Sequence, residues 1–209
     1  MARSFFFDTI SLAAPKEKIY RRLGYRKGTT HVKPHEAEET DRAIDDALSL
    51  VRLAGVAVRL AVDREKDPEI KLANGETLTS KSLVGLLSRS DEVMLMGATA
   101  GAAIMEEIKK DTGQGRMTRA VVLDAAASEV VDLALDWMMA YLEGELRREN
   151  RRLTKRRFSA GYGDFPLQNQ EWIYRTLGLD RLGVRLTEAY LLVPEKSVTA
   201  LAGVEPIKA

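Results

Sequence analysis

The sequence predicts an α+β fold, in which one domain contains a twisted, mainly antiparallel sheet flanked by helices. Along the chain, segments with apolar residues every three or four positions are interspersed with short segments in which apolar and polar residues alternate. Several strand-like segments are joined by tight turns such as Asn74-Gly75, which favours antiparallel pairing. No internal repeat, low-complexity tract or clear linker divides the 209 residues, so we expect residues 1–209 to form a single domain.

The first half of the chain is expected to open with a strand over 5–12. Pro15 suits the first turn of the helix that follows, and Gly24 ends that helix. A second helix begins at Pro34, has acidic residues in its first turn and runs toward Gly55. The next elements are expected to be a strand over 56–62, a hairpin over 70–78 and a short helix over 81–87 that Ser80 caps.

The second half begins with an apolar strand over 92–96, which is expected to end at Gly97 in a tight turn into a helix over 101–110. The longest element is a helix over 115–150, because apolar residues recur there at helical spacing. Asp124 lies beside this apolar stripe, and we expect it to be buried and hydrogen-bonded to a nearby backbone group. The remaining elements are a helix over 168–177, a strand over 184–186 and a final pair of strands over 190–193 and 197–204 around Pro194.

The composition is that of a globular chain without a strong overall charge. Hydrophobic residues make up 45% of the chain and charged residues 30%, and the net charge is +1. This near-neutral balance gives no global field to recruit nucleic acid, and an aromatic content of only 6% further disfavours a nucleic-acid interface. No stretch approaches the roughly twenty apolar residues of a membrane span, and the N-terminus lacks a signal-peptide pattern. We therefore expect no membrane association and a cytoplasmic location.

Cysteine and histidine usage limits the chemistry further. The chain has no cysteine, which excludes disulfides, thiolate catalysis and cysteine-ligated metals. Its two histidines, His31 and His35, are separated by Pro34 and are not expected to share a helical face as a metal-binding pair. We expect neither a metal site nor a catalytic group that works alone.

A basic segment, RRENRRLTKRR, runs from Arg147 to Arg157 and contains seven arginines and lysines. One interpretation is a solvated helix end, which the negative end of the helix dipole favours. The other is a docking face for an acidic partner. The residue pattern alone leaves both open.

The segment Arg157–Pro166, RFSAGYGDFP, has the composition of a functional loop. Glycine and proline interrupt both helices and central strands, so its backbone is free to face a ligand. Arg157 can hold a carboxylate in two-point fashion, and backbone N–H groups of Gly161 and Gly163 and the ring of Tyr162 would suit a zwitterionic or cationic small molecule. The alternative is a surface loop without a ligand.

Three short motifs follow one another in the C-terminal third: R-x-x-x-G-Y at Arg157–Tyr162, G-V-x-L-T-E at Gly183–Glu188 and P-E-K-S-V at Pro194–Val198. Their order and spacing resemble the C-terminal half of the activation domain of cobalamin-dependent methionine synthase. Upstream, the segments 23–26, 95–101 and 122–126 resemble the stand-alone members of that family. The resemblance therefore covers nearly the whole chain.

The resemblance implies that the protein binds S-adenosylmethionine and docks on a methionine synthase core or related corrinoid protein that carries the cobalamin. It would then support reductive reactivation, with a flavodoxin-like protein as electron donor, and would not turn over alone. In this family's motif the arginine matches Arg157 and holds the methionine carboxylate, while Glu188 is placed to hold the α-ammonium or sulfonium group. The candidate ligand-binding residues are Arg157, Ala160, Gly161, Tyr162, Gly163 and Glu188.

Three departures from the family pattern define a rival hypothesis. The acidic ligand contact that the long enzymes supply near the start of the domain has no match before Pro15. Ala160 replaces the usual proline, and Thr199-Ala200 follows Val198 where the long methionine synthases place aromatic residues. The rival protein would be a non-catalytic assembly subunit that caps the corrinoid of a methyltransferase and has no working S-adenosylmethionine site.

Overall fold

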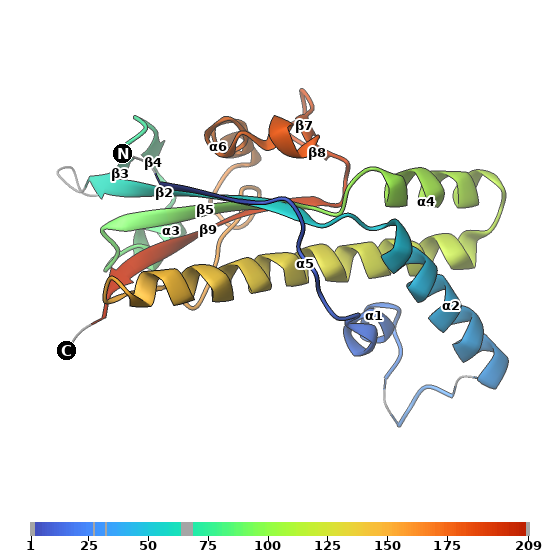
Figure 1. Cartoon of the computed structure of the whole chain (residues 1–209). Helices are drawn as coiled ribbons and strands as arrows, with labels where there is room; N and C mark the ends of the chain where they lie inside the picture. Colours follow the sequence, from blue (N-terminus) through green and yellow to red (C-terminus); the bar gives the residue numbers. More distant parts are fainter. Residues whose placement is uncertain (1–2, 27, 32, 64–68, 208–209) are drawn as a thin grey trace.

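The computed structural model describes residues 3–26, 28–31, 33–63 and 69–207, and it has the expected α+β architecture with an antiparallel sheet (Figure 1). The helices are α1 (Lys16–Arg22), α2 (Pro34–Leu50), α3 (Lys81–Leu86), α4 (Ala103–Gly113), α5 (Met117–Arg147), α6 (Gln170–Leu177) and the short 3-10 helices η1 (Leu167–Asn169) and η2 (Leu179–Leu182). The strands are β1 (Arg3–Phe7), β2 (Ala54–Asp63), β3 (Ile70–Leu72), β4 (Thr77–Leu78), β5 (Glu92–Thr99), β6 (Arg151–Leu153), β7 (Arg185–Leu186), β8 (Leu192–Val193) and β9 (Ser197–Pro206).

The main sheet has the strand order β4-β3-β2-β5-β9-β6, and β1 pairs with β2. Each pairing among the described strands is antiparallel. Strands β5 and β9 are buried along almost their whole length rather than at alternate residues. Such continuous burial means that both faces of the sheet are covered.

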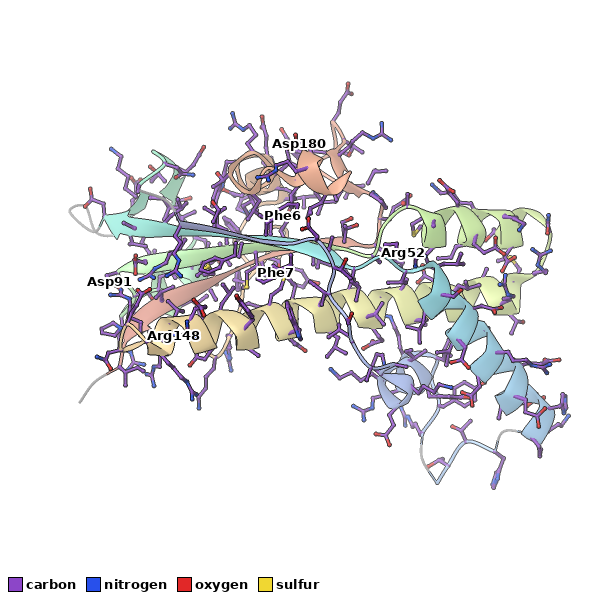
Figure 2. The ribbon with its side chains drawn as sticks, viewed as in Figure 1. Phe6, Phe7, Arg52, Asp91, Arg148 and Asp180 are labelled. Atoms are coloured by element: carbon purple, nitrogen blue, oxygen red, sulfur yellow. The ribbon has the colours of Figure 1, made fainter. Side chains whose placement is uncertain are left out.

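The two faces are covered by different elements (Figure 1). Helix α5 lies along one face, where α1, α2 and α4 pack against it, and α6 with the β7-β8 hairpin lies on the other. Strand β1 shows the division, because Phe7 packs against Trp137 and Tyr141 of α5 while Arg181 of η2 lies 4.7 Å from the ring of Phe6. Figure 2 shows these two phenylalanines on opposite sides of the strand.

The prediction that Gly97 ends its strand is wrong. Strand β5 continues to Thr99, and the chain turns at Gly101, whose φ is +83°. Gly97 instead lies under the second layer: an added Cβ would stand 2.6 Å from Leu179 Cδ2 and 3.1 Å from Leu177 Cδ1. Glycine is therefore required at this position by a tertiary contact, and not by a turn.

Two further predictions about the C-terminal half differ from the structure. The basic segment does not simply end a helix, because residues 151–153 form β6 on the edge of β9. The final two strands do not pair with each other either: β8 pairs with β7 in a separate two-stranded sheet, and β9 joins the main sheet beside β5. These pairings join segments that are distant in sequence, which local patterns do not specify.

Asp124 is also not buried as predicted. Its side chain is 48% exposed, and its carboxylate pairs with Lys196 Nζ at 2.7 Å. Lys196 precedes β9, so this ion pair connects the beginning of β9 to α5. Asp124 therefore lies on the side of α5 that meets the polar residue preceding β9, and not on the side that packs in the apolar core.

Asp164 fixes the glycine loop to the short helix α3. Its Oδ1 accepts a hydrogen bond from Ser80 Oγ at 2.7 Å, and both carboxylate oxygens lie 3.3 Å from the Ser82 backbone nitrogen. These donors, Ser80 first, lower the pKa of Asp164 to about 2 from its ordinary 3.8. The loop that carries the R-x-x-x-G-Y motif is thus attached to the helical layer by a charge-assisted contact.

We predict opposite effects of alanine at two glycines. Gly97→Ala should destabilise the fold by about 1–3 kcal/mol, because its methyl group overpacks the buried Leu177 and Leu179 side chains. Gly144→Ala, on the exposed face of α5 with open space around it, should stabilise the fold by about 0.5–1 kcal/mol. Urea unfolding of both variants measures the difference. An equal effect of the two substitutions would contradict the close packing at Gly97.

We also predict an acid-sensitive contribution from Asp164. Its pKa is lower in the folded state than in the unfolded state, so the contact stabilises the fold above about pH 4 and is lost as the pH falls toward 2. The melting temperature of the wild type should therefore fall more steeply over this window than that of Asp164→Asn. Asp180→Asn, at an exposed position on η2 (Figure 2), is the control and should follow the wild type.

Candidate functional site

A groove of about 910 Å³ lies where the glycine loop, α5, the start of α6, the β7-β8 hairpin and the start of β9 meet. It collects residues from five segments that are far apart in sequence. The lining residues are Asp132, Leu135, Arg156, Arg157, Phe158, Ser159, Ala160, Tyr162, Leu167, Gln170, Tyr190, Leu191, Leu192, Glu195, Ser197, Val198 and Thr199.

One wall of the groove is the open edge of β9. Strand β6 pairs only with residues 204–206, and Phe158 exchanges backbone hydrogen bonds with Leu201 at 2.8 and 2.9 Å. Backbone groups of an antiparallel strand point alternately to its two edges. Since Leu201 faces this edge, the N–H and C=O of Thr199 face it too, at a point where no described strand pairs with β9. The groove therefore offers a backbone donor and acceptor beside its side chains.

The glycine loop is shaped mainly by its own hydrogen bonds. Gly161 and Gly163 have φ angles of +88° and +55°, and the Gly161 N–H donates to the Phe165 carbonyl at 2.8 Å. That N–H group is thus used within the loop rather than offered to a ligand. Neither glycine lines the groove, whereas Ala160 and Tyr162 do. The Tyr162 side chain remains 69% exposed, so it stands at the mouth of the groove.

Arg157 lines the groove and is held by α5. Its Nη1 pairs with the Asp136 carboxylate, and its Nη2 lies 3.5 Å from the Asp132 carbonyl oxygen. A guanidinium has five N–H donors in a planar fork, so one ion pair leaves donors for a ligand. Asp132 also lines the groove. Although Asp132 keeps solvent contact, the protein atoms around this carboxyl raise its pKa, an effect that Arg157 opposes.

Several groove residues were not singled out in the sequence. Asp132 is one of many acidic residues on a long helix, and Gln170 belongs to a polar run at the start of α6. Thr199 Oγ1 donates to Gln170 Oε1 at 3.0 Å, and both residues are buried. Only the folding of α5, α6 and β9 around one loop brings these side chains together.

Glu188 lies apart from the other candidate residues. It is an exposed residue in the turn between β7 and β8, and it does not line the groove. The acidic side chains that do line it are Asp132 and Glu195, of which Glu195 also pairs with Lys109 at 3.4 Å. Of the candidate residues, the structure places Arg157, Ala160 and Tyr162 together.

The basic segment is partly neutralised within the protein. Arg148 pairs with Glu145 and Arg147 with Glu143 along the end of α5. Arg151 pairs with Asp91 and Glu92, and Arg152 with Glu205. Figure 2 shows Arg148 at the C-terminal end of α5, on the side of the molecule where Asp91 lies. A share of the positive charge that the sequence concentrates here thus serves to hold β6 and its neighbours.

The structure also bears on metal binding and on membrane-spanning helices. No group of three or more His, Asp or Glu side chains among the described residues is arranged to hold a metal ion. Within the same part of the chain, no helix has both the length and the apolar character needed to cross a bilayer.

Comparison with known proteins finds a shared fold but no matching sequence. No protein-family model matches the chain, and no curated protein sequence matches it. A solved structure, the crystal structure of the MetH reactivation domain bound to AdoHcy, aligns with a TM-score of 0.67 at 15% sequence identity. The alignment covers 100% of this chain and 80% of that chain. At this identity the match shows that the two chains share a fold, and the protein therefore has the fold of the MetH reactivation domain.

Proposed function

We propose that this protein binds S-adenosylmethionine in the groove at the β9 edge and acts as a stand-alone reactivation protein for a cobalamin-dependent methionine synthase. One observation carries the proposal. The arginine, alanine and tyrosine of the R-x-x-x-G-Y run line a groove, in a fold shared with a domain that holds AdoHcy, S-adenosylhomocysteine. AdoHcy is S-adenosylmethionine without its transferable methyl group.

The charges in the groove fit the methionine part of this ligand. Arg157 offers the remaining donors of its fork to the α-carboxylate. Asp132 provides a carboxylate on the same side of the groove for the α-ammonium group. Arg157 Nη2 lies 3.5 Å from the Asp132 carbonyl oxygen, so the guanidinium stands beside the backbone of the residue that carries this carboxylate. A zwitterion would thus meet both of its counter-charges in one place.

The mouth of the groove suits transfer to a second protein. Tyr162 is 69% exposed and Leu191 56% exposed, and both line the groove. An aromatic ring near the sulfonium stabilises its positive charge. The exposed pair would also contact a corrinoid-carrying partner placed over the mouth. On that partner, the reduced corrinoid supplies the nucleophile that accepts the methyl group, while this chain binds and orients the methyl donor.

The alternative is an assembly subunit that caps a corrinoid without binding S-adenosylmethionine. It is favoured by the pairing of Arg157 with Asp136, which occupies part of the fork, and by Thr199-Ala200, where the long methionine synthases place aromatic residues that help to hold the ligand. Ligand binding and partner-dependent chemistry separate the two candidates.

We predict that Arg157→Ala weakens S-adenosylmethionine binding by about 1.5–3 kcal/mol, the range for a hydrogen bond to a charged group. Arg157→Lys should restore only part of the affinity, since an ammonium group lacks the planar fork. Calorimetric titration measures both variants. Arg148→Ala, whose arginine is 78% exposed at the end of α5, is the matched control and should bind as the wild type does. Equal affinities of Arg157→Ala and Arg148→Ala would contradict the assigned role.

We predict no methyl transfer when the protein is mixed only with S-adenosylmethionine and a reductant, because the corrinoid nucleophile is absent. Addition of a methionine synthase core carrying cob(II)alamin, with an electron donor such as a flavodoxin, should yield methylcobalamin at a rate that rises with the concentration of this protein. The visible spectrum of the corrinoid reports the product. If the rate with its natural partner is the same without this chain, the reactivation role is excluded and the assembly subunit is favoured.

A further inference from the structure

Gln170 lies in the wall of the groove, and only one of the two polar atoms of its side-chain amide has a hydrogen-bond partner. The residue is 4% exposed and is the first residue of α6. Its Oε1 accepts from Thr199 Oγ1 at 3.0 Å, but its Nε2 is buried without a hydrogen-bond partner. A buried donor without an acceptor costs free energy that an apolar side chain of the same shape would not. The Nε2 group therefore points to an acceptor that arrives with a ligand.

The neighbourhood of Gln170 differs from the neighbourhood of Arg157. Val198 packs with the core under α5, whereas Leu201, on the same face of β9 as Thr199, packs with the core under α6. The groove thus passes from the α5 side of the sheet edge, where Asp132, Arg156 and Arg157 carry charge, to the α6 side. On that side Gln170 and Thr199 are neutral, as are the lining residues Leu167 and Leu192.

A ligand that is charged at one end and neutral at the other would lie along this gradient. The amino acid part of an adenosyl thioether or sulfonium belongs at the charged end, so its purine base belongs at the neutral end. Adenine presents an exocyclic amino donor beside a ring nitrogen acceptor, and a glutamine amide matches that pair in two-point fashion. The carbonyl oxygen has two lone pairs, so the bond from Thr199 leaves one for the base.

We propose that Gln170, oriented by Thr199, recognises the adenine base of the ligand. Nε2 donates to the ring nitrogen N1, and the free lone pair of Oε1 accepts from the exocyclic amino group. The Thr199 hydroxyl fixes which end of the amide meets which atom. Because Nε2 is covered by protein without the ligand, the adjoining wall moves aside as the base enters. This inference rests on the proposed binding of S-adenosylmethionine and extends it to the selection of the base.

The test compares two ligands that differ only in the base, AdoHcy and S-inosylhomocysteine. In the inosyl compound a carbonyl oxygen replaces the exocyclic amino group and N1 carries a proton, so Oε1 of the fixed amide meets an acceptor and Nε2 meets a donor. The wild type should bind AdoHcy about tenfold or more tightly than the inosyl compound, as expected for one two-point base contact. Calorimetric titration gives both dissociation constants.

Two variants isolate the amide and its orientation. In Thr199→Val the amide of Gln170 can turn over. This variant should therefore show a smaller preference for AdoHcy, and it should bind the inosyl compound more tightly than the wild type does. The double variant Gln170→Met/Thr199→Val replaces both partners with apolar groups of similar shape, which keeps the melting temperature near that of wild type. It should lose about tenfold in AdoHcy affinity together with the preference. Gln168→Met, at the exposed glutamine two residues earlier, is the control and should change neither.

The outcomes separate this inference from the proposed function. If the wild type binds AdoHcy and the double variant keeps both the affinity and the preference, base recognition by Gln170 is excluded while ligand binding stands. Loss of binding together with a large drop in melting temperature in the double variant, and no change of preference in Thr199→Val, would assign the pair a structural role and overturn the inference. If wild type binds neither compound, the proposed ligand fails and the inference fails with it.

Discussion

The placement of β9 is the constraint on which the rest of the structure depends. It pairs with β5 along eight residue positions, from Ser197 beside Thr99 to Val204 beside Glu92. Its other edge is covered in the second half by β6 and by Phe158, and remains open near its start. One strand thus closes the core of the sheet and supplies the wall of the groove. A change that shifted its register would move every groove residue on it to the opposite face.

Cover on both faces explains why the central strands tolerate so little side-chain volume at certain positions. An added Cβ at Gly55 would meet Met138 Sδ of α5 at 2.6 Å, and one at Gly97 would meet Leu179 at the same distance from the other side. The sheet therefore has a close contact with each of its two layers. Because packed interiors deform little, these contacts fix α5 and the α6 region relative to the strands. The groove lies where both layers reach the open strand edge.

The charged residues of the chain are used locally rather than as a global field. Lys196, Arg157 and Arg151 each pair with an acidic side chain from a distant segment, and the net charge of the chain is +1. The carboxylate in each of these pairs is exposed, and ion pairs open to solvent in this way contribute little stability individually. Their effect is positional: Arg157 is held against α5 with part of its fork free, and Lys196 fixes the approach to β9. The groove inherits its charged end from this arrangement.

Much of the fold follows from local sequence patterns. Periodic apolar residues predicted α5, the Asn74-Gly75 turn predicted the β3-β4 hairpin, and Ser80 was expected to cap α3, where its side chain accepts from the Leu83 N–H at 3.1 Å. These features depend on interactions within a few residues, so one sequence suffices to find them. The R-x-x-x-G-Y run likewise marked the loop that lines the groove.

Only the tertiary structure decided which segments meet. The sequence gives no local sign that Arg151 belongs to a strand, that Gly97 lies beneath Leu179, or that Glu188 stands away from the groove while Asp132 lines it. Gln170 is one polar residue among several in the sequence, and it gains its role only beside Thr199, 29 positions later. Strand pairing and packing between distant segments are set by the total burial that the chain achieves, which no single window of sequence contains.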